Sequence, residues 1–160
     1  MSSVHDFTAQ TIHGQDADLA DYAGKALLVV NVASECGLTP QYADLEALHR
    51  QYAAKGLAVH GFPCNQFKGQ EPGNEEQILD FCQTHYDVSF PLFSKIEVNG
   101  PNRHPLYAYL AGEGAAFPGD ISWNFEKFLI DKDGQPLARF APRTTPNDPA
   151  VVAAIEEALA

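Results

Sequence analysis

The sequence predicts an α/β fold with a central mixed sheet flanked by helices. Two nearly continuous apolar runs, 26–33 and 57–62, enclose a segment with helical periodicity, which is the pattern of a β-α-β unit. A second pair of apolar runs surrounds an Asp-Gly turn near the C-terminus, and this pattern predicts a β-hairpin. The 160 residues contain no repeats and no linkers, so we expect one domain over residues 1–160.

The first strand and helix follow from residue types and from the signals at their ends. The run 26–33 is rich in β-branched residues, as expected of a strand that is buried on both faces. The next helix is predicted to have Thr39 as its N-cap, Pro40 at its first position and Gly56 as its stop. The run 57–62 then forms a second strand. Such a unit favours a parallel strand pair with a right-handed crossover.

The later elements complete the sheet and its helical cover. Asn74 predicts the start of a helix, with Gln77 three residues on as its capping-box partner. The segment 6–12 could add a peripheral strand. The remaining elements are a short helix over 105–110, strands over 125–130 and 137–140 around the Asp133-Gly134 turn, and a helix over 149–159. In this order the elements predict a thioredoxin-like fold.

Composition and cysteine usage exclude several classes of function. The net charge of −11 would repel a phosphate backbone, so we expect no nucleic-acid partner. Neither a secretory signal nor a run of ~18 apolar residues is visible, which predicts a cytoplasmic protein without stable membrane association. The cysteines at 36, 64 and 82 form no CxxC pair and are too few for a disulfide scaffold. We therefore expect no metal site and no bound cofactor.

Cys36 is the first candidate for a reactive residue. It lies between a buried strand and a helix, and the carboxyl end of a parallel strand is where sites form in open α/β sheets. Backbone N–H groups and the helix dipole favour an anion there, which for a cysteine is the reactive thiolate. Gly37 leaves room for a substrate to approach the backbone. A junction loop is usually exposed, so we predict a reactive cysteine rather than a buried structural one.

The neighbouring residues narrow the chemistry of Cys36. No histidine falls in a recognisable partner motif, which disfavours a cysteine hydrolase. Thr39 stands where a disulfide oxidoreductase would carry the second cysteine of CxxC. A lone thiolate served by neutral hydrogen-bond donors suits attack on a peroxide O–O bond. Gln70, Trp123 and Asn124 offer such donors from two further loops, although each of them alone is a weak signal.

Three motifs occur in order along the chain: NVASECGLTPQY around Cys36, GFPCNQFKGQEPG around Gln70 and WNFEKFLIDKDG around Trp123. With these motifs the sequence resembles the glutathione peroxidase family over almost its whole length. The resemblance implies a thioredoxin-like fold and a peroxidase site of Cys36, Gln70, Trp123 and Asn124. In that family the residue at position 36 is cysteine or selenocysteine and attacks the peroxide. The other three residues hydrogen-bond it and polarise the peroxide.

The resemblance also implies a role for Cys82. In cysteine-containing, thioredoxin-using members, a second cysteine on the helix after the Gln loop attacks the sulfenic acid of the first to give a disulfide. Cys82 lies in that place. Because a disulfide needs Cα atoms within ~7 Å, we expect local unfolding of this helix during closure. The alternative is that Cys82 only fills apolar space, and for Cys64, which follows Pro63 at a strand end, we favour such a structural role.

Some features distinguish this chain among its relatives. Glu35 stands where many relatives have Lys, and an acidic neighbour disfavours a thiolate, so activation of Cys36 depends on the helix terminus and the three donors. The segment 110–123 is shorter than in oligomeric, glutathione-using animal relatives. This implies a monomer with an open site for bulky lipid hydroperoxides and a protein reductant. Lys68 is the chief cation near these loops, which leaves little to bind glutathione carboxylates and favours thioredoxin as the reductant.

The expected reaction is reduction of hydrogen peroxide and of organic or lipid hydroperoxides to water or alcohols. Three alternatives stay open on the sequence alone. One is a glutathione-dependent peroxidase without a resolving step. The second is a peroxide sensor that relays its disulfide to a partner protein, and the third is a non-catalytic thioredoxin-like binding module.

Overall fold

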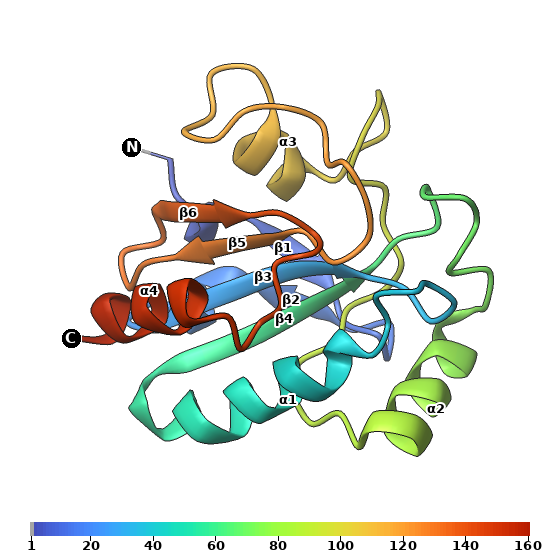
Figure 1. The fold of residues 1–160 in the computed structure, drawn as a ribbon. Helices are drawn as coiled ribbons and strands as arrows, with labels where there is room; N and C mark the ends of the chain where they lie inside the picture. Colours follow the sequence, from blue (N-terminus) through green and yellow to red (C-terminus); the bar gives the residue numbers. More distant parts are fainter. Residues whose placement is uncertain (1) are drawn as a thin grey trace.

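A four-stranded sheet forms the centre of the computed structural model, which describes residues 2–160 (Figure 1). Strands β3 (Ala26–Val32) and β4 (Leu57–Pro63) are parallel. Strand β5 (Lys127–Ile130) lies antiparallel to β3, and β6 (Pro136–Phe140) lies antiparallel to β5. The order across the sheet is β4-β3-β5-β6, so the predicted mixed sheet is confirmed.

Helices cover both faces of this sheet (Figure 1). Helices α1 (Gln41–Tyr52), α2 (Glu75–Tyr86) and α4 (Pro149–Leu159) contribute to the apolar core on one face. Helix α3 (Pro105–Ala111) contributes to the core on the other face. Alternate residues of β3 divide between the two cores, and every residue of β3 and β4 is buried. This two-sided burial explains why both strands appear in the sequence as nearly continuous apolar runs.

The N-terminal segment forms a separate two-stranded ribbon. Strand β1 (Thr8–Gln10) pairs antiparallel with β2 (Asp16–Asp18), outside the central sheet. The predicted peripheral strand over 6–12 is thus confirmed in shortened form. Its partner was not predicted because Asp-Ala-Asp contains no β-branched or aromatic residue that would favour a strand. Three 3₁₀ turns complete the elements: Val4–Asp6, Leu19–Tyr22 and Ala53–Lys55.

The predicted start of α1 is wrong by one residue, because Pro40 stands at the N-cap position and not at the first position of the helix. The helix begins at Gln41 with no side-chain cap, and Thr39 does not cap it. Instead, the Thr39 Oγ1 accepts a hydrogen bond from the N–H of Cys36 (3.0 Å) and donates one to the carbonyl of Ala33 (2.7 Å). Thr39 therefore closes the turn that carries the cysteine. At the other end, Gly56 takes a left-handed conformation (φ 104°) after the final 3₁₀ turn, so this predicted stop is confirmed.

Helix α2 begins as predicted. Asn74 accepts a hydrogen bond from the N–H of Gln77 (2.9 Å), and the Gln77 side chain accepts one from the N–H of Asn74 (2.9 Å). On its apolar face only Ile78 and Cys82 are fully buried. No helix within residues 2–160 is long and apolar enough to cross a membrane.

The strand predicted over 125–130 begins two residues late, at Lys127. The reason is Phe125, whose φ of 68° lies in the left-handed region and interrupts the extended backbone. Its N–H donates to the carbonyl of Asn31 (2.7 Å), and the Asn31 side chain donates to the carbonyl of Trp123 (3.0 Å). These contacts fix the turn before β5 against the carboxyl end of β3.

Candidate active site

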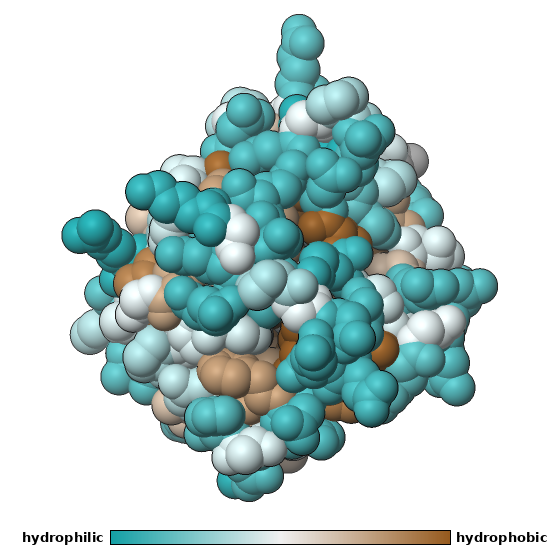
Figure 2. All heavy atoms as spheres, turned by 90° about the vertical axis from the view of Figure 1, so that its right-hand side faces the viewer, coloured by the Kyte–Doolittle hydropathy of each residue, from teal (hydrophilic) through white to brown (hydrophobic). Residues whose placement is uncertain are grey.

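The loops that were singled out in the sequence meet at the carboxyl end of β3. Cys36 follows β3, Gln70 lies in the loop after β4, and Trp123 with Asn124 precedes β5. The N–H of Glu35 donates to the carbonyl of Gln70 (3.0 Å), which ties the first two loops together. Figure 2 faces this end of the sheet and shows small apolar patches among mostly hydrophilic residues.

The sulfur of Cys36 accepts two hydrogen bonds. The donors are the Nε1 of Trp123 (3.3 Å) and the backbone N–H of Leu38 (3.3 Å). Both are neutral, so they stabilise a thiolate without neutralising it. The expectation of an exposed cysteine is wrong, because the residue is only 8% exposed. It nevertheless lines a cavity of about 740 Å³, which provides a path for a substrate.

Gln70 and Asn124 bind each other rather than the sulfur. The Nδ2 of Asn124 donates to the Oε1 of Gln70 (3.0 Å), and in the described part of the chain neither side chain hydrogen-bonds Cys36. Asn124 is fully buried, and its Oδ1 has no hydrogen-bond partner among residues 2–160. Of the three donors that the resemblance implied, only Trp123 contacts the sulfur directly. The other two form an amide pair from the same two loops.

The carboxyl group of Glu71 was missed by the sequence analysis. It is 1% exposed, and its Oε1 accepts a hydrogen bond from the N–H of Ser34 (3.1 Å), two residues before Cys36. Burial raises the pKa of Glu71 to about 7, with the charge of Glu35 adding to the shift and that of Lys95 opposing it. The only feature of the sequence that could have indicated this buried carboxyl group is its position between Gln70 and Pro72.

Cys82 lies on α2 and is completely buried. Burial raises the pKa of its thiol to about 11, and the hydroxyl group of Tyr42 lies beside it. Cys64 is also buried, and burial raises the pKa of its thiol. All three cysteines are free thiols. The two candidate redox cysteines therefore differ, since the sulfur of Cys36 faces a cavity and that of Cys82 does not.

One wall of the cavity comes from a segment that the sequence analysis did not identify. The lining residues are Cys36, Gly37, Leu38, Ser122, Trp123, Ala141, Pro142 and Arg143. The buried Nζ of Lys127 donates to the carbonyls of Phe125 (2.6 Å) and Pro142 (3.0 Å). Burial lowers the pKa of Lys127 to about 8. This lysine thus links the turn after Trp123 to the wall formed by residues 141–143, which directly follow β6.

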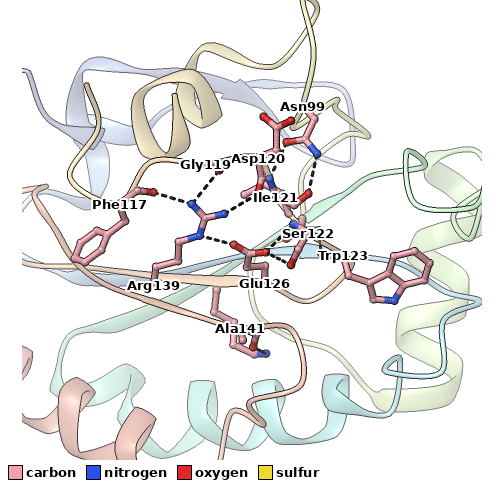
Figure 3. Close-up of polar contacts among 12 residues, drawn as sticks. Asn99, Phe117, Gly119, Asp120, Ile121, Ser122, Trp123, Glu126, Arg139 and Ala141 are labelled. Carbon is pink, nitrogen blue, oxygen red and sulfur yellow. Dashed lines mark hydrogen bonds and ion pairs between the residues drawn. The ribbon is translucent and has the colours of Figure 1, made fainter. Parts of the chain in front are cut away.

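An ion pair between the buried Glu126 and the partly buried Arg139 holds the segment that leads to Trp123 (Figure 3). Arg139 on β6 contacts Glu126, whose carboxylate accepts hydrogen bonds from the N–H (2.9 Å) and hydroxyl (2.8 Å) of Ser122. The guanidinium of Arg139 also donates to three backbone carbonyls, those of Phe117 (2.7 Å), Gly119 (3.0 Å) and Asp120 (3.0 Å). The pair therefore positions the loop on the amino-terminal side of the indole. Within residues 2–160 no group of three or more His, Cys, Asp or Glu could hold a metal ion.

The model of the family described as Glutathione peroxidase matches residues 4–111. The chain belongs to the glutathione peroxidase family. A hydroperoxy fatty acid reductase, Gpx2 of Synechocystis sp., is 59% identical over 137 residues, which cover 86% of each chain. The thioredoxin/glutathione peroxidase BtuE of Escherichia coli is 45% identical and covers 99% of this chain and 98% of its own.

Solved structures agree with this membership. The crystal structure of Trgpx in apo form matches with a TM-score of 0.79 and 37% identity, covering 99% of this chain and 95% of that one. A thiol:disulfide interchange protein of the thioredoxin family from Chlorobium tepidum matches with a TM-score of 0.70 at 19% identity, over 96% and 93% of the two chains. The predicted thioredoxin-like fold is confirmed. The protein is a glutathione peroxidase-like thiol peroxidase.

Proposed function

We propose that this peroxidase reduces hydrogen peroxide and organic or lipid hydroperoxides at Cys36. The observation that carries the proposal is the position of the sulfur, at the wall of a cavity of about 740 Å³ and 3.3 Å from the Nε1 of Trp123. Neutral donors at that distance favour the thiolate, which is the attacking form of cysteine. Gln70 and Asn124 are proposed to polarise the peroxide from the adjoining loops.

The first chemical step is attack of the Cys36 thiolate on the terminal peroxide oxygen. An S–O bond forms while the O–O bond breaks, so the sulfur is oxidised to a sulfenic acid and the peroxide is reduced. The leaving alkoxide or hydroxide takes a proton and departs as alcohol or water. The N–H donors that stabilise the thiolate also stabilise negative charge on the leaving oxygen.

The second step is resolution by Cys82. Its sulfur attacks the Cys36 sulfenic acid, an S–S bond replaces the S–O bond, and the hydroxide leaves as water with the thiol proton of Cys82. Thioredoxin then reduces the disulfide by thiol exchange. Because Cys82 is fully buried and its thiol has a raised pKa, local opening of α2 must precede this attack.

The names of two relatives support the substrate class and the reductant. One similar protein is called a hydroperoxy fatty acid reductase and another a thioredoxin/glutathione peroxidase. The walls of the cavity are largely apolar, with Leu38, Trp123 and Pro142 among the lining residues. We therefore include fatty-acid hydroperoxides among the substrates. Thioredoxin is the proposed reductant, and glutathione is the alternative.

The central test is Cys36→Ser in an assay with thioredoxin, thioredoxin reductase and NADPH. Consumption of NADPH with hydrogen peroxide or cumene hydroperoxide should disappear in this variant. Cys64→Ser is the matched control, because Cys64 is buried elsewhere in the fold and should retain turnover. A Cys36→Ser variant with the turnover of the wild type would exclude the proposed mechanism.

The resolving step needs its own test. After one equivalent of peroxide, mass spectrometry of a tryptic digest should find a disulfide between Cys36 and Cys82. Cys82→Ala should stop turnover with thioredoxin after the first oxidation. Normal thioredoxin-dependent turnover in this variant would remove the role of Cys82, and faster turnover with glutathione than with thioredoxin would favour the alternative reductant.

We further propose that the protein acts as a single-domain, cytoplasmic monomer. Three free thiols suit a reducing compartment, and the short segment before Trp123 suits a site that is open to a protein reductant. Size-exclusion chromatography with light scattering at micromolar concentration should give the mass of one 17.4 kDa chain. A stable dimer would contradict this.

A further inference from the structure

Arg143 is the single charged residue among the eight that line the cavity beside Cys36. The cavity walls include the indole of Trp123 and the apolar side chains of Leu38 and Pro142. An apolar channel with one cation matches an amphipathic molecule that has an apolar body and one anionic end. Neutral hydroperoxides such as cumene hydroperoxide have no anionic group to pair with the guanidinium.

The guanidinium of Arg143 has no partner in the described part of the chain. The other three arginines all contact carboxylates: Arg50 with Glu46 and Asp87, Arg103 with Asp120, and Arg139 with Glu126. The sequence contains 21 acidic residues against 10 basic ones, so acidic partners are abundant. Even so, within residues 2–160 the side chain of Arg143 makes neither an ion pair nor a hydrogen bond. Its charge is therefore available to a ligand.

The backbone next to Arg143 is held in place. The carbonyl of Pro142 accepts hydrogen bonds from the Nζ of Lys127 (3.0 Å) and from the Nε2 of Gln41 (2.8 Å). Both donors are buried, and Pro142 itself is buried, whereas Arg143 is exposed. A fixed backbone with a free side chain allows the guanidinium to reach over the cavity from a defined starting point.

We propose that Arg143 is a specificity-determining residue that binds the carboxylate of a hydroperoxy fatty acid while its hydroperoxide group reaches Cys36. The proposal rests on the proposed function and names the substrate class of that same site. The average field of a chain with net charge −11 repels anions, so one uncompensated cation has a large influence on whether a fatty acid can enter. The guanidinium fork also suits two-point binding of a carboxylate.

A carboxylate at this place could also come from glutathione. The experiment therefore measures substrate selectivity with thioredoxin as the only reductant. The readout is the ratio of kcat/KM for a hydroperoxy-octadecadienoic acid to kcat/KM for its methyl ester, both below their critical micelle concentrations. The ester keeps the apolar chain and the hydroperoxide but lacks the charge, so the ratio isolates the contribution of the carboxylate.

We expect Arg143→Gln to lower this acid-to-ester ratio about tenfold, mainly through a higher KM for the acid, as for loss of one charge-assisted contact. Arg143→Lys should restore part of the ratio because it restores the charge. Arg103→Gln is the matched control, since Arg103 lies outside the cavity lining and pairs with Asp120, and its ratio should equal that of the wild type. Titration of the reduced product, the hydroxy fatty acid, against the fluorescence of Trp123 should show weaker binding in Arg143→Gln and unchanged binding in Arg103→Gln.

An unchanged acid-to-ester ratio in Arg143→Gln would overturn the proposal. In a parallel assay with glutathione, loss of turnover in Arg143→Gln alongside an unchanged acid-to-ester ratio with thioredoxin would assign the carboxylate site to the reductant and would also overturn the proposal. Failure of the proposed function looks different. In that case the wild type itself reduces neither the acid nor the ester, or Cys36→Ser reduces both.

Discussion

The thiols of Cys36 and Cys82 differ in their surroundings although both residues are buried. The sulfur of Cys36 accepts two N–H hydrogen bonds and faces a cavity. The sulfur of Cys82 is enclosed on α2, where burial raises its pKa to about 11. The first environment favours a thiolate that meets a peroxide directly. The second keeps the thiol protonated, which suits the proposed resolving step, in which Cys82 acts after Cys36.

At this scale the indole of Trp123 is the most direct test of how Cys36 is activated. Trp123→Phe keeps an aromatic ring against Phe67 and removes the N–H donor. A hydrogen bond to a charged group contributes ~1.5–3 kcal/mol, so the second-order rate constant for oxidation of Cys36 by hydrogen peroxide should fall about tenfold or more. Competition with a peroxidase of known rate measures it. A rate constant equal to that of the wild type would show that the backbone N–H of Leu38 suffices.

At the scale of elements, the start of β5 and the end of β6 position the residues of the site. Glu126 and Lys127 are consecutive residues, and each binds one wall of the cavity. Glu126 accepts a hydrogen bond from Ser122, and Lys127 donates one to the carbonyl of Pro142. Glu126 works together with Arg139 on the neighbouring strand, and this pair holds the loop that leads to Trp123 (Figure 3). The hairpin around the Asp-Gly turn thus places both walls relative to Cys36.

Arg139→Met should release the loop before Trp123. The variant leaves the carboxylate of Glu126, whose side chain is only 4% exposed, without its cation, and loss of one partner of a buried pair costs about 3 kcal/mol. Urea unfolding should show this loss, and the emission of Trp123 in the folded state should shift to the red as the indole becomes more exposed. The double variant Glu126→Gln/Arg139→Met removes both charges and should be more stable than Arg139→Met alone. A double variant that is less stable would contradict the assignment of the cost to an unpaired carboxylate.

At the scale of the whole molecule, two apolar cores enclose several titratable groups, and these make stability depend on pH. Glu71 has a folded-state pKa of about 7, raised mainly by burial. Its stabilising contribution is complete below its unfolded-state pKa of ~4.3, and it is lost as pH rises to about 7, where the carboxyl group must ionise inside the fold. His60 has the opposite effect, because burial lowers its pKa to about 3, so protonation favours the unfolded state at acidic pH.

Glu71→Gln should therefore be more stable than the wild type at pH 8, by up to about 3.5 kcal/mol, and nearly equal to it at pH 4. Glutamine keeps an oxygen that can accept the hydrogen bond from the N–H of Ser34. Urea unfolding at the two pH values measures the difference. Glu76→Gln on the exposed side of α2 is the control, and it should change stability little at either pH. Equal stability of Glu71→Gln and the wild type at pH 8 would show that the carboxylate is solvated.

Local sequence patterns determined the order and type of the elements. Nearly continuous apolar runs predicted the two central strands, the Asn74–Gln77 pair predicted the start of α2, and the Asp-Gly turn predicted the hairpin. These signals involve only a few neighbouring residues, so they can be recognised in the sequence without knowledge of the tertiary structure. Thr39 shows the limit of such signals. Its hydroxyl group could cap the helix or close the turn that carries Cys36, and in the folded chain it closes the turn.

The sequence by itself determined the fold class, the reactive-cysteine loop and the three motifs that mark the family. Only the tertiary structure decided which groups touch the sulfur, which carboxyl groups are buried, and that Arg143 lines the same cavity as Cys36. The physical reason is distance along the chain. The indole that binds Cys36 is 87 residues away from it, and the amide pair of Gln70 and Asn124 joins positions 54 residues apart. Hydrogen bonds and charge pairs of this kind leave no local pattern, because their geometry exists only once the sheet has brought the loops together.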